Sequence, residues 1–179
     1  MNTSPTFLVL QAFGADKPGA LESLSKVCAQ AGCQILDSRW VVLGDTYSFG
    51  ALLRGSWSAV AKLEAGLPKL EKRLNSSIIF RRTEPAKLAT KALPYAIEVI
   101  SAERPGVVQD VTSFLVSQKI GIVDMQTETY IAPRTSLPML LLKLTVSVPA
   151  KHSISLFRDE FFTYCEEHQL DATMEPYKH

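Results

Sequence analysis

Two short loops, residues 16–19 and 103–106, carry the residue types best suited to bind a small zwitterion. They read Asp-Lys-Pro-Gly and Glu-Arg-Pro-Gly, so each offers an acid, a base, a proline and a glycine in the same order. Proline fixes φ, and glycine lets a ligand approach the backbone closely. A helix starting after each loop would present free N–H groups to a carboxylate, and the acidic side chain could receive an ammonium group. A single copy would favour a plain strand-to-helix turn, and two copies with the same four residue types make an amino-acid ligand an equally good interpretation.

These loops belong to an internal repeat with a constant offset of 87 residues. Apolar positions 21, 24, 27 and 28 fall on apolar positions 108, 111, 114 and 115, and the string 35–37 falls on 122–124. A matching turn, helix face and strand at one offset indicate two copies of one module. We expect a first module over residues 1–82, a linker over 83–93 and a second module over 94–179, since the linker shows no clear periodicity.

The elements that must position the loops follow the same order in both copies. In the first copy we expect strands at 7–13, 35–42, 47–53 and 78–82 and helices at 21–31 and 60–74. In the second copy we expect strands at 95–100, 122–131, 140–148 and 170–174 and helices at 107–118 and 154–164. Pro68 should break or restart its helix, because it cannot donate a backbone hydrogen bond. The order predicts an α+β fold of two tandem ferredoxin-like βαββαβ modules, each a four-stranded antiparallel sheet with two helices on one face.

Other polar positions allow two interpretations. Asp37 and Asp124 could face a ligand or a joint between subunits, but strand alternation slightly favours solvent. Arg39 could clamp an anion, or it could be an ordinary exposed strand charge. Cys28 lies on the apolar helix face and is expected in the core, whereas Cys33 follows a glycine and is expected to be partly exposed.

Bulk properties narrow the class of protein. The net charge of +1 argues against a strong phosphate-backbone binder, so we expect no direct contact with nucleic acid. There is no apolar run long enough to span a membrane, and no signal peptide is apparent. Three unpaired-looking cysteines suit the reducing cytoplasm. The three histidines lack ligand-like spacing, and no catalytic motif is present, so we expect no metal, no cofactor and no enzyme activity, leaving open a site assembled from dispersed residues.

The two halves resemble tandem ACT domains, and the full layout resembles the glycine cleavage system transcriptional repressor family. The resemblance covers residues 7–176. Its carriers are the segments 14–19, 32–39, 103–106, 124–133 and 170–172. It implies that a small amino acid, with glycine a plausible one, binds beside the loop after the first strand, at a joint between modules. It also implies repression through a transcription activator of the LysR type, without DNA contacts by the chain itself.

The loops and the resemblance together predict the site residues. In the first module these are Asp16, Lys17, Pro18, Gly19, Ala20, Gln34 and Ile35, and in the second they are Glu103, Arg104, Pro105, Gly106, Val107 and Ile122. ACT modules often place an asparagine at the start of the second strand, where this chain has Gln34 and Gly121, so the second site lacks that side chain.

The sequence also suggests a surface for a protein partner and leaves two other classes of protein open. Arg134, in the longer connection 132–138, is expected on a surface that binds the activator, because loops held out by a scaffold often carry recognition. A homodimer is a further candidate assembly. The alternatives are a regulatory subunit or amino-acid-binding module of a metabolic enzyme and, ranked lower, a nucleic-acid-binding ferredoxin-like protein, which would need exposed aromatics and a basic surface.

Overall fold

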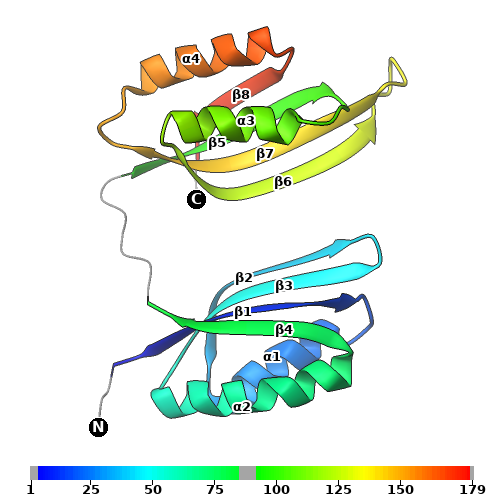
Figure 1. Ribbon diagram of the computed structural model, residues 1–179, viewed down its shortest axis with the longest axis vertical. Coiled ribbons are helices and arrows are strands. Elements are labelled where there is room, and N and C mark those ends of the chain that lie inside the picture. The colour runs from blue at the N-terminus through cyan, green and yellow to red at the C-terminus, as the bar shows by residue number, and fades with distance from the viewer. Residues whose placement is uncertain (1–3, 85–91, 178–179) are drawn as a thin grey trace. The chain divides into compact units, whose positions relative to one another are not determined.

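The computed structural model describes residues 4–84 and 92–177 of the 179-residue chain. The chain divides into two compact units, Met1–Lys87 and Leu88–His179, which we call the first and second modules (Figure 1). Strand β4 ends at Thr83 and β5 begins at Ala92, so both ends of the expected linker lie in strands. Residues 85–91 of that linker lie outside the described residues.

The first module has the order βαββαβ. Its elements are β1 (Thr6–Ala15), α1 (Ala20–Ala31), β2 (Gln34–Leu43), β3 (Thr46–Gly55), α2 (Trp57–Leu74) and β4 (Ser76–Thr83). The four strands are antiparallel in the order β2-β3-β1-β4, and both helices cover one face of the sheet (Figure 1).

The second module repeats that architecture. Its elements are β5 (Ala92–Ala102), α3 (Val107–Ser117), β6 (Gly121–Ile131), β7 (Pro138–Pro149), α4 (Ile154–Glu167) and β8 (Asp171–Pro176). The strand order is β6-β7-β5-β8, again antiparallel with both helices on one face. The predicted fold class, two tandem ferredoxin-like βαββαβ modules, each a four-stranded antiparallel sheet with two helices on one face, is confirmed.

Each module has its own core between helices and sheet. Alternate residues of the central strands, such as Leu8 and Leu10 in β1, are fully buried and meet apolar residues spaced three or four apart on the helices, such as Leu63 and Leu67 in α2. The second core is richer in aromatic rings, with Phe114 packed against Phe157 and Phe161 at ring distances of 6.2 and 5.6 Å.

The prediction that Pro68 interrupts its helix is wrong. Helix α2 runs unbroken from Trp57 to Leu74 with Pro68 inside it. An internal proline costs about 3 kcal/mol through the lost hydrogen bond and the clash with the preceding turn. Leu67 and Leu70, on either side of it, are almost fully buried. Burying two leucine side chains contributes roughly 1.5–3 kcal/mol each, which offsets the cost.

Both second strands contain a bulge at the repeated string. The pairing of β2 with β3 shifts between Ile35 and Asp37, and the pairing of β6 with β7 shifts between Ile122 and Asp124. One extra residue is therefore inserted at the same place in each module. The repeated Ile-apolar-Asp string is the sequence record of this bulge.

The expectation for Cys33 is also wrong. Its side chain is buried, because Cys33 lies beside Gly55, where an added Cβ would be 3.1 Å from the Cys33 sulfur. Cys28 lies in the core as predicted. All three cysteines are free and buried.

Candidate functional site

The two predicted loops have the same backbone geometry at the start of α1 and α3. Gly19 and Gly106 are the N-cap residues, with φ of 87° and 97°, in the left-handed region that favours glycine. Neither helix receives a side-chain cap, whereas Ser56 caps α2 and Ser153 caps α4 by accepting a backbone hydrogen bond. Helices α1 and α3 therefore present N–H groups and a positive dipole end to whatever lies beside the loops.

Each loop is hydrogen-bonded to the segment that joins the second and third strands of its module in chain order. The N–H of Asp16 donates to the carbonyl of Asp45 at 2.8 Å, and the N–H of Glu103 donates to the carbonyl of Pro138 at 3.0 Å. The longer connection that carries Arg134 thus lies next to the second loop, and Arg134 is exposed. The structure brings together the second loop and the segment that was expected to bind a partner.

The first loop keeps its charged side chains available. Asp16, Lys17, Pro18 and Gly19 are exposed, while Ala20 is buried and anchors the start of α1. Within residues 4–84, neither Asp16 nor Lys17 forms a side-chain hydrogen bond or ion pair. The backbone N–H of Ala20 donates to the carbonyl of Lys17 at 3.2 Å, which closes the turn.

The second loop is tied to its own module. Arg104 forms an ion pair with Asp110 in the first turn of α3 at 2.8 Å, and a longer hydrogen bond of 3.4 Å to the carbonyl of His168. The loop borders a hollow of about 430 Å³ on the start of α3. Its lining residues are Arg104, Gly106, Val107, Val108, Gln109, Thr112 and Leu140. Three of the predicted residues therefore line a hollow, but the cation among them is already engaged.

The end of α4 supports this arrangement. The hydroxyl of Tyr164 donates to the carbonyl of Asp110 at 3.1 Å, and the ring of His168 stacks on Tyr164 at 3.9 Å. Burial, together with the carboxylate of Asp110, raises the pKa of Tyr164, so the phenol stays protonated and keeps donating. Nothing comparable holds the described residues of the first loop.

Sequence reasoning missed the residues that restrain the second loop. The acid in the first turn of α3, Asp110, could have been found, because that position favours an acid and lies close to the basic residue of the loop. Tyr164 and His168 carried no usable signal, since they are 54 and 64 residues away from the groups that they bond.

The predicted strand residues lie at the far end of each module from the loops. Helix α1, about 18 Å long for 12 residues, separates the loop at its start from Gln34 beyond its end. Gln34 is exposed and accepts a hydrogen bond from Arg54 at 2.6 Å; Ile35 packs on the core, and Ile122 is 39% exposed. Loop and strand residues of one module do not meet, so a site using both sets needs a second module.

Two charged residues beside the bulge of β2, Asp37 and Arg39, face solvent, as the strand alternation predicted. Asp37 and Arg39 are exposed and pair with each other on the face of the sheet away from the helices. They border a hollow of about 290 Å³ that also includes Gln11 and Gly50. Asp124 is half-buried.

Two classes of site find no support in the described part of the chain. Within residues 4–84 and 92–177, no three His, Cys, Asp or Glu side chains gather as metal ligands would. Every helix described is too short or too polar to cross a membrane. Burial raises the pKa of Cys28 to about 11 and that of Cys165 to about 12, so these thiols are poor nucleophiles at neutral pH.

Comparisons with known proteins agree with the geometry. The ACT domain family matches residues 6–81. The glycine cleavage system transcriptional repressor of Escherichia coli (strain K12) is 27% identical over 165 residues, which cover 92% of this chain and 87% of that protein, and the Shigella flexneri protein of the same name matches equally.

Solved structures show the same fold over the full length. A protein assigned as a glycine cleavage system transcriptional repressor superposes with a TM-score of 0.74 at 24% identity, covering 99% of this chain and all of that one. An unknown protein from Galdieria sulphuraria gives a TM-score of 0.75 at 21% identity, covering 98% and 100%. With two modules of one fold, the first of which matches the ACT domain family, the chain is similar over nearly its whole length to the glycine cleavage system transcriptional repressor.

Proposed function

We propose that this chain is a cytoplasmic amino-acid sensor that represses glycine cleavage genes by binding a transcription activator. The match to a repressor over 92% of the chain supports the regulatory role, and ACT modules support a small ligand. The ligand is a small zwitterionic amino acid, glycine first among them, and the switch needs no chemistry.

One observation carries the ligand class. The two helices that follow the Pro-Gly loops lack side-chain caps, and the other two helices are capped by serine. An amino-acid carboxylate beside Gly19 would take the place of such a cap, because it can accept hydrogen bonds from the first-turn N–H groups. The exposed carboxylate of Asp16 would then receive the ammonium group.

The first loop is the stronger site in this proposal. Lys17 is unengaged within the described residues, whereas Arg104 is paired with Asp110. Replacing Asp110 by Asn would weaken that pair and make the second loop more like the first. Calorimetry should then show a second, weaker binding event per chain, at a stability cost below about 1 kcal/mol for a partly exposed pair.

Calorimetric titration of the full chain with the twenty amino acids tests the ligand class. Ligand at a hundred times its dissociation constant should stabilise the fold by about 2.7 kcal/mol. Gly19→Ala should abolish this gain. An added Cβ meets no atom closer than Glu22 Oε2 at 4.0 Å, so the cost to folding is the positive φ alone.

Gly32→Ala is the matched control. Gly32 ends the same helix with φ of 84°, and its added Cβ would have only an ordinary contact at 3.7 Å with Ala59. Both variants carry the same backbone strain, so only a role of the loop in binding separates them. Equal affinity in the two variants would show that the ligand does not use this loop.

A pull-down with the activator, with and without glycine at matched salt, tests the regulatory half. Glycine should lower the affinity of the chain for the activator by about 5- to 150-fold, the range of typical allosteric coupling. Arg134→Ala should weaken the complex more than it weakens glycine binding. A complex that forms equally well in both conditions rejects the glycine switch, even if amino-acid binding holds.

A further inference from the structure

Both modules have a groove between their two helices, at equivalent positions. The first groove, of about 440 Å³, lies between α1 and α2, and the second, of about 430 Å³, lies between α3 and α4. Val27 and Ala31 line the first, and their repeat partners Phe114 and Gln118 line the second. The two grooves can therefore be compared position by position.

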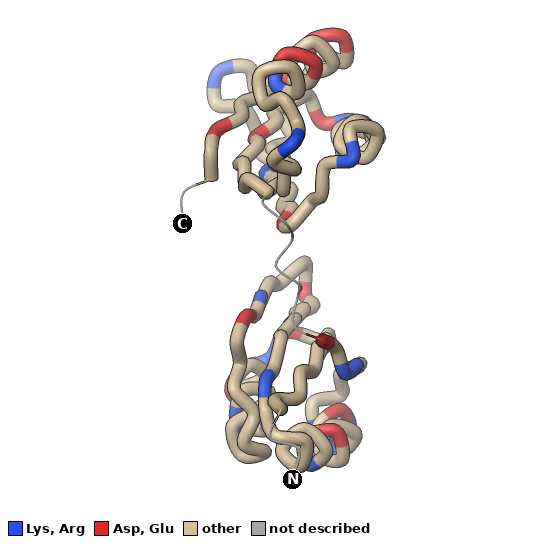
Figure 2. The backbone as a smooth tube through the Cα atoms, turned by 90° about the vertical axis from the view of Figure 1, so that its left-hand side faces the viewer, with Lys and Arg blue, Asp and Glu red and all other residues tan. Residues whose placement is uncertain are grey.

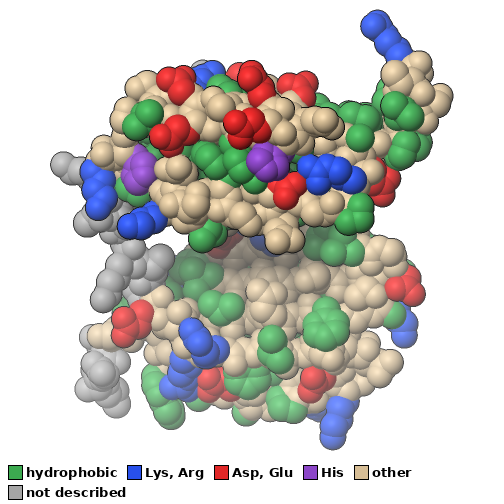
Figure 3. Space-filling view, turned by 45° about the horizontal axis from the view of Figure 1, so that its top comes forward, with side chains coloured by type: hydrophobic (Ala, Val, Ile, Leu, Met, Phe, Trp, Pro, Cys, Tyr) green, Lys and Arg blue, Asp and Glu red, His purple; other side chains and the backbone are tan. Residues whose placement is uncertain are grey.

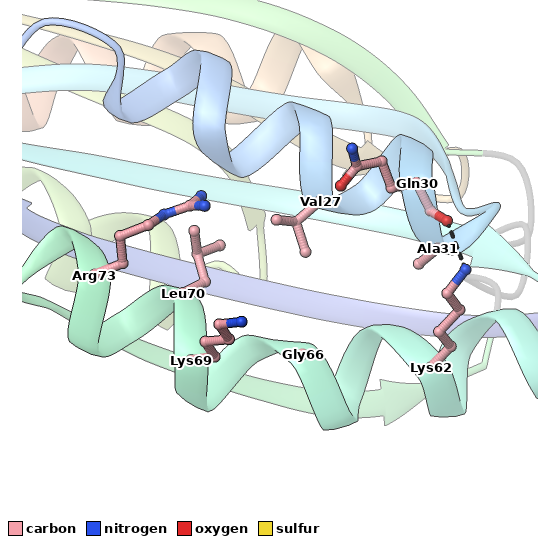
Figure 4. Close-up of a pocket in the computed structure, with 8 residues that line it drawn as sticks. All are labelled: Val27, Gln30, Ala31, Lys62, Gly66, Lys69, Leu70 and Arg73. Atoms are coloured by element: carbon pink, nitrogen blue, oxygen red, sulfur yellow. Dashed lines mark hydrogen bonds between the residues drawn. The ribbon is translucent and has the colours of Figure 1, made fainter.

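The groove of the first module is basic. Lys62, Gly66, Lys69 and Arg73 form one stripe along α2, at the spacing that faces a neighbouring helix (Figure 4). The three cations are exposed. Lys62 donates to the carbonyl of Gln30 at 3.0 Å, and no acid is among the residues described as lining the groove.

The acids of α2 point to the opposite side. Glu64 accepts two hydrogen bonds from Arg82 of β4, at 2.9 and 2.8 Å, which lower the pKa of that carboxyl. Glu71 accepts a hydrogen bond from the backbone N–H of Ile78 at 2.9 Å. Neither carboxylate is placed to neutralise the cations of the groove.

The groove of the second module is acidic. Asp159, Glu160 and Glu167 line it from α4, all exposed, and no base is among the lining residues described. The helices as a whole follow the same division: α1 and α2 contain five basic and three acidic residues, and α3 and α4 contain one basic and five acidic. Figure 2 marks acidic positions along the helices of the second module, and Figure 3 shows acidic side chains gathered on that side of the module.

We propose that these two surfaces bind each other between two copies of the chain. The helix layer of the first module of one copy packs on the helix layer of the second module of its partner. Because every copy carries one basic and one acidic groove, a twofold arrangement satisfies both grooves of both copies and closes the assembly as a dimer. This inference is independent of the amino-acid ligand.

The size of the surfaces favours use of both. Two helices of this length with axes about 10 Å apart give a layer of roughly 20 by 20 Å, or about 400 Å². One such contact alone would be no larger than typical crystal packing, whereas two give about 800 Å² per copy, the standard size of a specific interface. Charge complementarity would set the pairing and speed its formation.

Gly66 is a second, independent observation that favours binding of another surface in the first groove. A glycine inside a helix costs roughly 0.5–1 kcal/mol relative to alanine. No atom lies within 4 Å of an added Cβ there, so the fold of the module does not require it. The second groove presents Glu160, an exposed side chain long enough to occupy the space beside Gly66.

Sedimentation equilibrium of the full chain tests the proposal. A dimer is expected at 50 mM salt, with weaker association at 500 mM, since exposed charges are screened. Lys62→Glu/Lys69→Glu/Arg73→Glu makes both grooves acidic, and Asp159→Lys/Glu160→Lys/Glu167→Lys makes both basic. Each triple variant alone should dissociate at least about tenfold more readily.

Mixing the two triple variants gives the decisive result. Every contact in the mixed pair again joins an acidic to a basic groove, so a heterodimer should form with about the affinity of the natural dimer. Lys69→Glu should weaken the natural dimer more than Arg81→Glu, a matched charge reversal at an exposed position of β4. Gly66→Gln should also weaken it while raising the stability of the module.

Circular dichroism spectra and thermal melts of each variant would show whether a loss of dimer reflects misfolding. A natural chain that stays monomeric at 50 mM salt overturns the proposal. So do folded triple variants that remain dimeric alone, or that fail to pair when mixed.

Discussion

The two modules share a backbone plan and differ in how their surfaces use charge. Both have an uncapped helix after the Pro-Gly loop, a serine cap on the other helix and a bulge at the same place. Yet the charges of the first loop have no partner among residues 4–84 and 92–177, whereas Arg104 ties the second loop to Asp110. One inter-helix groove is basic and the other is acidic. Backbone geometry and core packing are constrained by folding, whereas exposed charges contribute little to stability and can diverge.

Core truncation in the second helix of each module should give the largest effects. Leu67 in α2 and Phe161 in α4 are 1% and 0% exposed. Leu67→Ala should cost about 2–5 kcal/mol and Phe161→Ala about 3–5 kcal/mol, because each leaves a cavity. Calorimetry should show each variant lowering one transition and leaving the other, since each module has its own core. A single transition that shifts in both variants would mean that the modules unfold as one unit.

The serine caps should give a smaller and nearly equal effect in both modules. Ser56 accepts from the N–H of Ala59 at 3.1 Å, and Ser153 accepts from the N–H of Leu156 at 3.4 Å. Ser56→Ala and Ser153→Ala should each cost about 1 kcal/mol, with the larger loss at the shorter bond, measured by urea denaturation. Ser113→Ala, at an exposed position inside α3, is a control that removes a serine hydroxyl without touching a cap. A cost at Ser153 well above that at Ser56 would contradict this ranking.

The buried thiols should have the smallest effect on stability near neutral pH, and their labelling reports the opening of each module. Burial raises the pKa of Cys28 to about 11, helped by Cys33, and that of Cys165 to about 12, each from an ordinary value of 9.0. The folded state holds these protons more tightly, so this stabilisation is complete below pH 9 and is lost as the pH rises through about 11 for Cys28 and about 12 for Cys165. A thiol reagent at pH 8 should react only as the modules open. Rapid labelling of the native chain would contradict the burial of these groups.

The fold could be predicted almost completely because its signals are local and repeated. Alternating apolar strands, two helix faces and the string 35–37 recurring at 122–124 are enough to define two modules. Pro68 was misjudged because the packing of its neighbours, which outweighs its local cost, is a tertiary effect.

The site could be predicted only in part, for a related reason. The residue types of the loops make them recognisable in the sequence. The prediction that groups Gln34 with the loop of its own module does not allow for the whole helix that separates the two. The pairing of Arg104 and the groove stripe at 62, 66, 69 and 73 depend on side-chain directions and on which helix lies opposite. In the sequence alone, charged residues at helical spacing indicate only an ordinary solvent-exposed helix face.

The bulges have a consequence for solubility. Strands β2 and β6 are outermost in their sheets, so each carries a row of backbone groups that could template another strand. In β2 the hazard is real, because Val41, Val42 and Leu43 are 43%, 42% and 68% exposed. The extra residue at Leu36 breaks the even spacing that a docking strand would need, and the Asp37–Arg39 pair adds charge beside it. The same small irregularity in both modules thus makes these two of the four outer strands, β2 and β6, poorer templates for fibril-like stacking.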